Sequence, residues 1–175
     1  MTGFRHIRAI AFDMGGTLFH EDYAATRSLR TTPFAEHVLE ELSHHATLVV
    51  ATNSNYSEGQ IGNLLERLHM RPYISHIFTS ASVVAMKPQP YFFEVMLREL
   101  QLQPDQMIMV GDSYQADIAG AKRAGLWTIW LTDSATEAPE ADAVISGLRG
   151  APPAAAWIDG LAADAAENAS RPRLP

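Results

Sequence analysis

Residues 9–19 read AIAFDMGGTLF: an apolar run ends in one carboxylate, Asp13, and two glycines follow. A short apolar run bounded by Asp and Gly is typical of a buried strand. Glycines directly after a strand let the main chain turn tightly and keep its amides near a ligand. The stretch therefore predicts a strand whose carboxyl end presents a single acid in a tight, amide-rich loop.

Further apolar runs resemble the first one, and segments of helical periodicity separate them. The predicted strands are residues 7–12, 47–51, 77–79, 106–110, 127–131 and 143–145. The predicted helices begin at Thr32-Pro33, at a capping box of Ser57 and Gln60, and at Pro90, and a fourth runs from Tyr114 to Ala124 with Gly125 as its stop. Strands that alternate with helices imply right-handed crossovers. We therefore predict an α/β fold: a three-layer, Rossmann-like parallel sheet with helices on both faces.

Composition excludes several classes of protein. The net charge of −7 argues against a general nucleic-acid binder, which needs a basic face. The chain has no cysteine, so disulfides and thiolate chemistry are excluded. No apolar stretch is long enough to span a bilayer and no signal-peptide pattern is present, so we expect no membrane partner and a cytoplasmic location. We expect one domain over residues 1–162 and a flexible tail over 163–175.

Polar residues follow three of the predicted strands, and the carboxyl ends of parallel strands meet at one edge of a sheet. Asp13, Thr52 and Asp112 follow three such strands, Lys87 precedes the third helix, and Asp117 lies one turn into the fourth. Three carboxylates at one place repel one another, and a divalent cation resolves that conflict. Mg²⁺ prefers oxygen ligands and a substrate phosphate. The lysine, the hydroxyl and the amides of residues 14–16 can then hold the phosphate oxygens.

Four segments carry a family resemblance. They are FDMGGTL, VVATNS, KPQPYFF and VGDSYQADIAGAKRAG, and they resemble, in order and spacing, the four motifs of the haloacid dehalogenase-like superfamily. The resemblance covers about residues 7–146. It implies a haloacid dehalogenase-like catalytic domain that hydrolyses phosphate esters with Mg²⁺ as cofactor.

The resemblance also implies a role for each motif residue. Asp13 is the nucleophile that forms an aspartyl-phosphate, Thr52 binds a phosphoryl oxygen, and Lys87 neutralises charge on Asp13 and on the transferring group. Asp112 binds Mg²⁺ directly, and Asp117 binds it through water or orients the loop.

Four neighbouring positions complete the predicted site. The carbonyl of Gly15 is a further expected metal ligand. Gly16, Thr17 and Asn53 are expected to bind substrate.

Gly15 departs from the phosphatases of this superfamily, in which a second aspartate at this position protonates the leaving oxygen and later activates water. Three explanations stay open. The substrate has a good leaving group; another acid substitutes, with His20, Glu21 and Asp22 closest in sequence; or the protein is a weak catalyst that binds phosphorylated ligands or partners. A metal-independent 2-haloacid dehalogenase also lacks this acid, but it ranks lower because Asp112 with Asp117 fits a Mg²⁺ site better.

The intervals between the motifs are too short for a cap domain. Between Asp13 and Thr52 there is room for a flap and one helix, and between Thr52 and Lys87 for one helix and one short strand. We therefore expect an open site. An open site suits a large phosphorylated substrate, a neighbouring subunit of a homo-oligomer that acts as a lid, or both.

Overall fold

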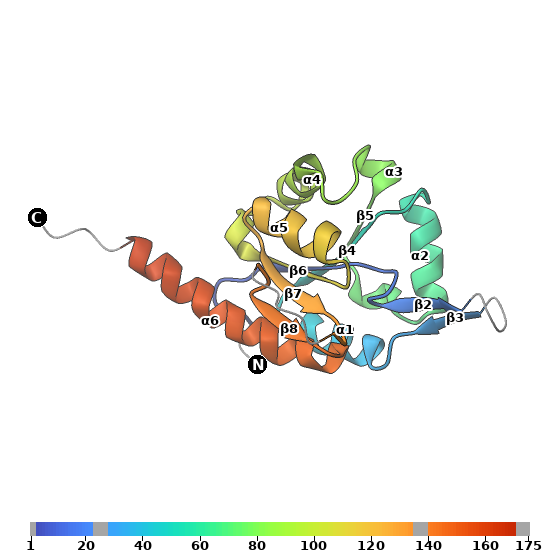
Figure 1. Ribbon diagram of the computed structural model, residues 1–175, viewed down its shortest axis with the longest axis horizontal. Helices are drawn as coiled ribbons and strands as arrows, with labels where there is room; N and C mark the ends of the chain where they lie inside the picture. The colour runs from blue at the N-terminus through green and yellow to red at the C-terminus, as the bar shows by residue number, and fades with distance from the viewer. Residues whose placement is uncertain (1–2, 23–27, 135–139, 171–175) are drawn as a thin grey trace, which may run out of the picture.

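The computed structural model describes residues 3–22, 28–134 and 140–170. A six-stranded parallel sheet forms its centre, in the order β5-β4-β1-β6-β7-β8 (Figure 1). The strands are β1 (Ala9–Phe12), β4 (Thr47–Thr52), β5 (His76–Thr79), β6 (Met107–Gly111), β7 (Trp127–Leu131) and β8 (Ala143–Ile145). All the strands that the sequence predicts are confirmed, with small shifts at their ends.

Helices cover both faces of the sheet. One face carries α1 (Ala35–Ser43), α2 (Glu58–Arg67) and α6 (Ala151–Ser170), and the other carries α3 (Ser80–Val83), α4 (Pro90–Leu100) and α5 (Gly120–Arg123) (Figure 1). Short helical turns η1 (Arg71–Tyr73), η2 (Pro104–Gln106), η3 (Tyr114–Ala119) and η4 (Leu148–Gly150) connect these elements. Alternate residues of a strand point to opposite faces, so Ile10 and Phe12 pack into one core and Ala9 and Ala11 into the other. The predicted three-layer α/β fold is confirmed.

The predicted helix starts are correct in three cases, including Tyr114 at the start of η3, and wrong in one. The Ser57 capping box begins α2 and Pro90 begins α4. Thr32 does not cap α1: Phe34 precedes that helix in a left-handed conformation, with φ of 67°, and no side chain caps it. The carbonyl of Thr32 accepts the N–H of Ala35, so a turn closes before the helix starts.

The segment between β1 and α1 forms a β-hairpin, the flap for which the sequence leaves room. Its strands are β2 (Phe19–Asp22) and β3 (Ser28–Thr31), which pair antiparallel. The hairpin projects beyond the carboxyl edge of the sheet (Figure 1). In the described residues only this hairpin and α1 lie between β1 and β4, and only α2 and η1 lie between β4 and β5. The described part of the chain therefore contains no second domain above the sheet edge.

Helix α6 continues through part of the segment that we expect to be a tail. It tolerates Pro152 and Pro153 because a proline in the first helical turn gives up an N–H that has no intrahelical partner. Residues 163–170 are thus the end of a helix and not a tail, whereas residues 171–175 lie outside the described residues. Neither α6 nor any other helix in the described ranges is long and apolar enough to cross a membrane.

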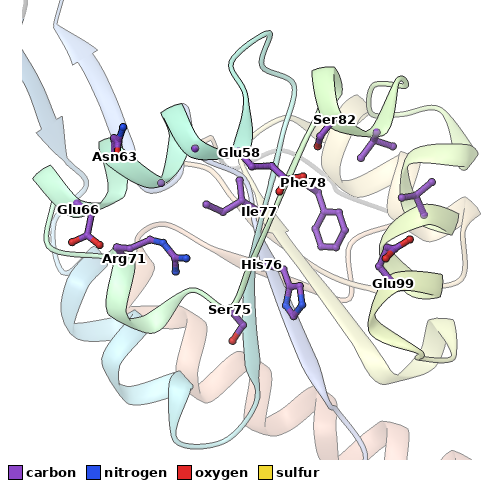
Figure 2. Close-up of a pocket in the computed structure, with 14 residues that line it drawn as sticks. Glu58, Asn63, Glu66, Arg71, Ser75, His76, Ile77, Phe78, Ser82 and Glu99 are labelled. Carbon is purple, nitrogen blue, oxygen red and sulfur yellow. The ribbon is translucent and has the colours of Figure 1, made fainter.

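A groove of about 670 Å³ runs along the outer strand of the sheet, between α2 and α4 (Figure 2). Its lining includes Arg71 and His76 together with Glu58, Glu66 and Glu99. It holds none of the residues that the sequence predicts for the functional site.

Candidate active site

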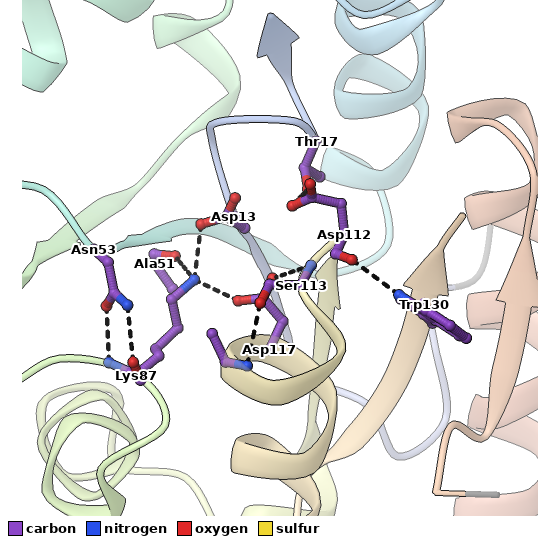
Figure 3. A network of polar contacts seen from close by, with 10 residues as sticks. Asp13, Thr17, Ala51, Asn53, Lys87, Asp112, Ser113, Asp117 and Trp130 are labelled. Carbon is purple, nitrogen blue, oxygen red and sulfur yellow. Dashed lines mark hydrogen bonds and ion pairs between the residues drawn. The ribbon is translucent and has the colours of Figure 1, made fainter. Parts of the chain in front are cut away.

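Lys87 is the centre of a buried polar network at the carboxyl edge of the sheet (Figure 3). Its Nζ donates to Asp13 Oδ1 at 2.8 Å, to Asp117 Oδ1 at 2.6 Å and to the carbonyl of Ala51 at 2.6 Å. The lysine is only 2% exposed. The structure thus brings together Asp13 after β1, the end of β4, the loop before α4 and the turn after β6, as the sequence predicts.

The charges of this network are coupled. Burial disfavours the ammonium of Lys87, but the attraction of Asp13 and Asp117 outweighs it and raises the pKa of Lys87 above its ordinary value. Burial, opposed by Lys87 and reinforced by Asp13, raises the pKa of Asp117 to about 6. One lysine therefore compensates two carboxylates, and the group as a whole remains short of positive charge.

Asp117 is held by its own turn as well as by Lys87. It lies in η3, which is wound as a π-helix, and its Oδ2 accepts the N–H of Ser113 at 3.0 Å. A Cβ on Gly111 would lie 2.2 Å from Asp117 Oδ2, so only glycine lets the carboxylate lie this close to β6. Because both oxygens of Asp117 already accept hydrogen bonds, this residue suits a positioning role or a water-mediated contact with a metal.

Three carboxylates fit the requirements of a hard divalent cation. Oxygen atoms of Asp13, Asp112 and Asp117 lie within 4.8 Å of one another. Partial burial and the nearby charge of Asp13 raise the pKa of Asp112. This oxygen-only donor set and its excess negative charge fit Mg²⁺.

Asp112 is placed by contacts from three directions. Trp130 Nε1 donates to its carbonyl at 2.9 Å, and Thr17 Oγ1 lies 3.4 Å from its Oδ1. Gly16 has φ of 81°, and a Cβ there would lie 2.1 Å from Asp112 Oδ2. Gly16 is therefore needed both for the turn and for the approach of the carboxylate.

Several groups that are predicted to bind substrate already make contacts within the protein. The N–H of Gly16 donates to the carbonyl of Phe19, so that amide is already used within the turn. Thr17 is fully buried against Asp112. Asn53 Oδ1 accepts the N–H of Lys87 and its Nδ2 donates to the carbonyl of Lys87, both at 2.8 Å. Asn53 thus positions the lysine loop, and its contact with substrate stays a prediction.

The remaining predicted residues lie at or near the edge of the site. Thr52 ends β4, directly after the carbonyl that binds Lys87, and is buried. Gly15 is exposed in the loop after Asp13. His20 is exposed on β2, and the side chains of Glu21 and Asp22 lie outside what the structure describes.

Sequence reasoning missed three contacts that hold the site: the carbonyl of Ala51, the N–H of Ser113 and the indole of Trp130. Two of them are main-chain groups, which any residue type supplies. Trp130 also contacts the ring of Tyr114, at 5.0 Å between centroids. The contacts of Ala51 and Trp130 depend on how neighbouring strands pack, so no local pattern in the sequence could have found them. The N–H of Ser113 binds a carboxylate only four residues further along the same turn.

The chain resembles known proteins in its family, its sequence and its fold. The family described as haloacid dehalogenase-like hydrolase matches residues 17–131. Ribulose-1,5-bisphosphate 5-phosphatase of Halopiger xanaduensis is 32% identical over 78% of this chain and 54% of its own length. Glyceraldehyde 3-phosphate phosphatase of Methanothermobacter thermautotrophicus is 31% identical over 59% of this chain and 49% of its own. The chain thus spans about half the length of the curated relatives it matches.

A solved structure shows the same fold. A protein from Listeria monocytogenes serotype 4b superposes with a TM-score of 0.76 at 23% identity, and the match covers 88% of this chain and 99% of that one. At this level of identity the likeness speaks for the fold alone.

Proposed function

Because the chain belongs to the haloacid dehalogenase-like hydrolase family, we propose that it is a Mg²⁺-dependent phosphohydrolase in which Asp13 is the nucleophile. The observation that carries the proposal is the network of Lys87 with Asp13 and Asp117, next to the carboxylate of Asp112. The phosphatase names of the relatives support hydrolysis of a phosphate ester over cleavage of a carbon–halogen bond.

The proposed reaction begins with Asp13. Its Oδ1 accepts the hydrogen bond of Lys87, and its other oxygen points away from the lysine and is the one that attacks phosphorus (Figure 3). The bond from phosphorus to the leaving oxygen breaks, and the leaving oxygen departs with its electron pair. Water then attacks the aspartyl-phosphate, which releases inorganic phosphate and restores the carboxylate of Asp13.

The other residues assist this exchange by their charges and positions. Lys87 neutralises the attacking carboxylate and the transferring group, and Asp117 and Asn53 keep the lysine in place. Asp13, the carbonyl of Gly15 and Asp112 would hold Mg²⁺, with Asp117 acting through water. The bound ion would offset the charge of the carboxylates and of the phosphoryl oxygens.

No side chain at position 15 protonates the leaving oxygen in the proposed reaction. We therefore expect activity that depends steeply on the leaving group, with p-nitrophenyl phosphate or an acyl phosphate far better than an alkyl phosphate. The same feature favours a second candidate function, a phosphate-binding or interaction module with little turnover. The exposed rim at Gly15 and Asp112 is consistent with a large substrate, or with a second copy of the chain as a lid.

A phosphatase screen with Mg²⁺ over a broad set of phosphate esters tests the proposal, with Asp13→Asn as the control. We expect hydrolysis that needs both the metal and Asp13. Activity that survives in Asp13→Asn would contradict the assigned nucleophile. Binding of phosphate without turnover of any ester would favour the module.

A further inference from the structure

A hollow of about 820 Å³ opens directly beside the candidate active site. Gly16 and Asp112 form part of its wall, and the rest comes from His20, the segment 32–34, residues 131–133 and residues 144–150. The lining is mostly apolar with a few polar groups, as in small-molecule sites generally. Because the hollow shares Gly16 and Asp112 with the active site, an ester bound at Asp13 can extend its leaving group into it.

Arg149 is the only lysine or arginine that lines this hollow within the described residues. Its guanidinium carbon lies 4.1 Å from the centroid of the Phe34 ring. Phe34 adopts a left-handed conformation, with φ of 67°, which is costly for an aromatic residue and is found where surrounding structure enforces it. The stacking of the two side chains limits where the guanidinium can move, so it is oriented before a ligand binds.

Arg149 has no carboxylate partner in the part of the chain that the structure describes. Asp112 and Asp133 also line the hollow, but no ion pair joins either of them to Arg149 among the described residues. Asp112 belongs to the carboxylate cluster at Asp13, where a bound Mg²⁺ would offset its charge. The planar guanidinium therefore keeps its donors for another group, and a carboxylate or a phosphate matches it best.

Thr32 provides an independent sign of a ligand. It lines the same hollow and is 7% exposed, and its Oγ1 has no hydrogen-bond partner among the described residues. Buried hydroxyls without a partner are rare because desolvation is not repaid. A bound acceptor would satisfy this hydroxyl.

We propose that the hollow receives the leaving group of the substrate and that Arg149 and Thr32 bind a second anionic group on it, a carboxylate or a second phosphate. The inference rests on the proposed phosphohydrolase function and narrows the substrate to phosphate esters with two anionic groups. Arg149 acts here as a specificity-determining residue and takes no part in the transfer to Asp13.

Two matched pairs of substrates test this, with p-nitrophenyl phosphate as the general substrate and the full chain with Mg²⁺ throughout. Glycerol 3-phosphate and 3-phosphoglycerate differ by a carboxylate, and fructose 6-phosphate and fructose 1,6-bisphosphate differ by a phosphate. We expect wild type to favour the member with the second anionic group in at least one pair, by roughly tenfold to a hundredfold in kcat/KM, since a hydrogen bond to a charged group contributes about this much. Arg149→Gln should remove that preference and Arg149→Lys should keep part of it. Arg98→Gln, an exposed arginine on the opposite face of the sheet, should leave it intact.

Thr32→Val separates recognition from folding. If the hydroxyl of Thr32 binds the ligand, the variant unfolds at no lower temperature than wild type, and its preference for the ester with a second anionic group falls. A lower unfolding temperature with an intact preference would show that the hydroxyl is structural.

The two levels of the proposal fail in different ways. Wild type could hydrolyse p-nitrophenyl phosphate but prefer neither 3-phosphoglycerate nor fructose 1,6-bisphosphate, or Arg149→Gln could keep the preference. Either result overturns the assignment of the hollow and leaves the proposed phosphohydrolase function intact. If wild type hydrolyses nothing, the phosphohydrolase fails. The affinities of wild type and Arg149→Gln for 3-phosphoglycerate and glycerol 3-phosphate, measured by calorimetry, then test the assignment of the hollow. Tighter binding of 3-phosphoglycerate that is lost in Arg149→Gln supports it, and equal binding overturns it.

Discussion

Replacing Gly15 with aspartate restores the acid that the site lacks, and the backbone accepts it. Gly15 is exposed, its φ lies outside the left-handed region, and a Cβ at this position meets no atom within 4 Å. The new carboxyl joins a loop that already carries Asp13 and faces Asp112. These like charges raise the pKa of the new carboxyl and favour its protonated, donating form. General acid catalysis is typically worth about 10²–10⁴ in rate, which corresponds to about 3–5 kcal/mol of activation barrier.

The assay compares kcat/KM for glycerol 3-phosphate and p-nitrophenyl phosphate, with Mg²⁺, in wild type, Gly15→Asp and Gly15→Asn. Gly15→Asp should raise hydrolysis of the alkyl ester by up to about 10²–10⁴. The aryl ester should change little, because p-nitrophenolate leaves without a proton. The asparagine side chain has the same shape but no acidic proton to transfer to the leaving oxygen, so this variant should show no gain. Asp13→Asn should abolish activity both by itself and when it is combined with Gly15→Asp.

Two results would refute this reasoning. If Gly15→Asp leaves the alkyl ester unchanged while Asp13-dependent hydrolysis of the aryl ester persists, protonation of the leaving group does not limit the rate. If wild type already cleaves alkyl esters quickly, another acid fills the role. The neighbouring Gly16→Ala is a contrast, because its φ of 81° and a Cβ 2.1 Å from Asp112 Oδ2 leave no room for a side chain. That variant should lose activity on both esters.

The other predictions concern the metal, the buried lysine and the link between the termini. Mg²⁺ at about one hundred times its Kd should stabilise wild type by about 2.7 kcal/mol in a thermal-shift titration, and Asp112→Ala should lose this response; an equal response would exclude the site. Lys87→Met should destabilise the protein by about 3–5 kcal/mol in urea unfolding because it leaves two buried carboxylates unpaired, whereas a stability equal to wild type would mean that the carboxylates are not charged. Although burial opposes its ionisation, the N–H groups of Arg5, Ile7 and His6 lower the pKa of Asp159 on α6. A lowered folded-state pKa gives stability that is present above the unfolded pKa of about 3.9 and lost as the pH falls through the folded value. Asp159→Asn should therefore cost about 1–3 kcal/mol at pH 7 and much less near pH 3, and a difference that does not depend on pH would contradict the charge-based reason.

The sequence predicts the strands and most helices because their signals are local. Apolar runs define the central strands, and the capping box at Ser57 and the proline at Pro90 define two helix starts. The sequence leaves room for a flap but does not predict the pairing of β2 and β3, because each strand has only four residues and most of them are polar. A tail is predicted from residue 163, but α6 continues to Ser170, and Pro152 and Pro153 lie in its first turn, where they cost no hydrogen bond.

The candidate site divides in the same way. Its charged members could be predicted, because Asp13 and Asp112 follow strands whose carboxyl ends meet at one edge. Lys87 and Asp117 belong to segments that resemble motifs of the same family. The contacts of Asn53 and Trp130 that hold them could not, since these contacts join residues far apart in sequence. Asn53 is hydrogen-bonded to the main chain of Lys87, and Trp130 to the main chain of Asp112. These contacts form only when β4, β6 and β7 are packed in one sheet. The sequence does not single out Arg149, because a lone exposed arginine before a helix resembles any solvated residue until the fold places Phe34 and Thr32 beside it.

The absence of an acid at Gly15 and the hollow beside Asp112 lead to one account of selectivity. The groups proposed for the phosphoryl transfer, Asp13 and Lys87, are held by buried contacts that do not involve the leaving group. An acid at position 15 would act on the leaving oxygen whatever else the leaving group carried. Without it, the rate depends on the leaving group itself and on how firmly the surrounding wall holds it. Binding of a second anionic group to Arg149 can then orient the ester for attack, which raises the rate only for esters that carry this group. In the proposed reaction, Arg149 therefore supplies a selectivity that a general acid at position 15 would not supply.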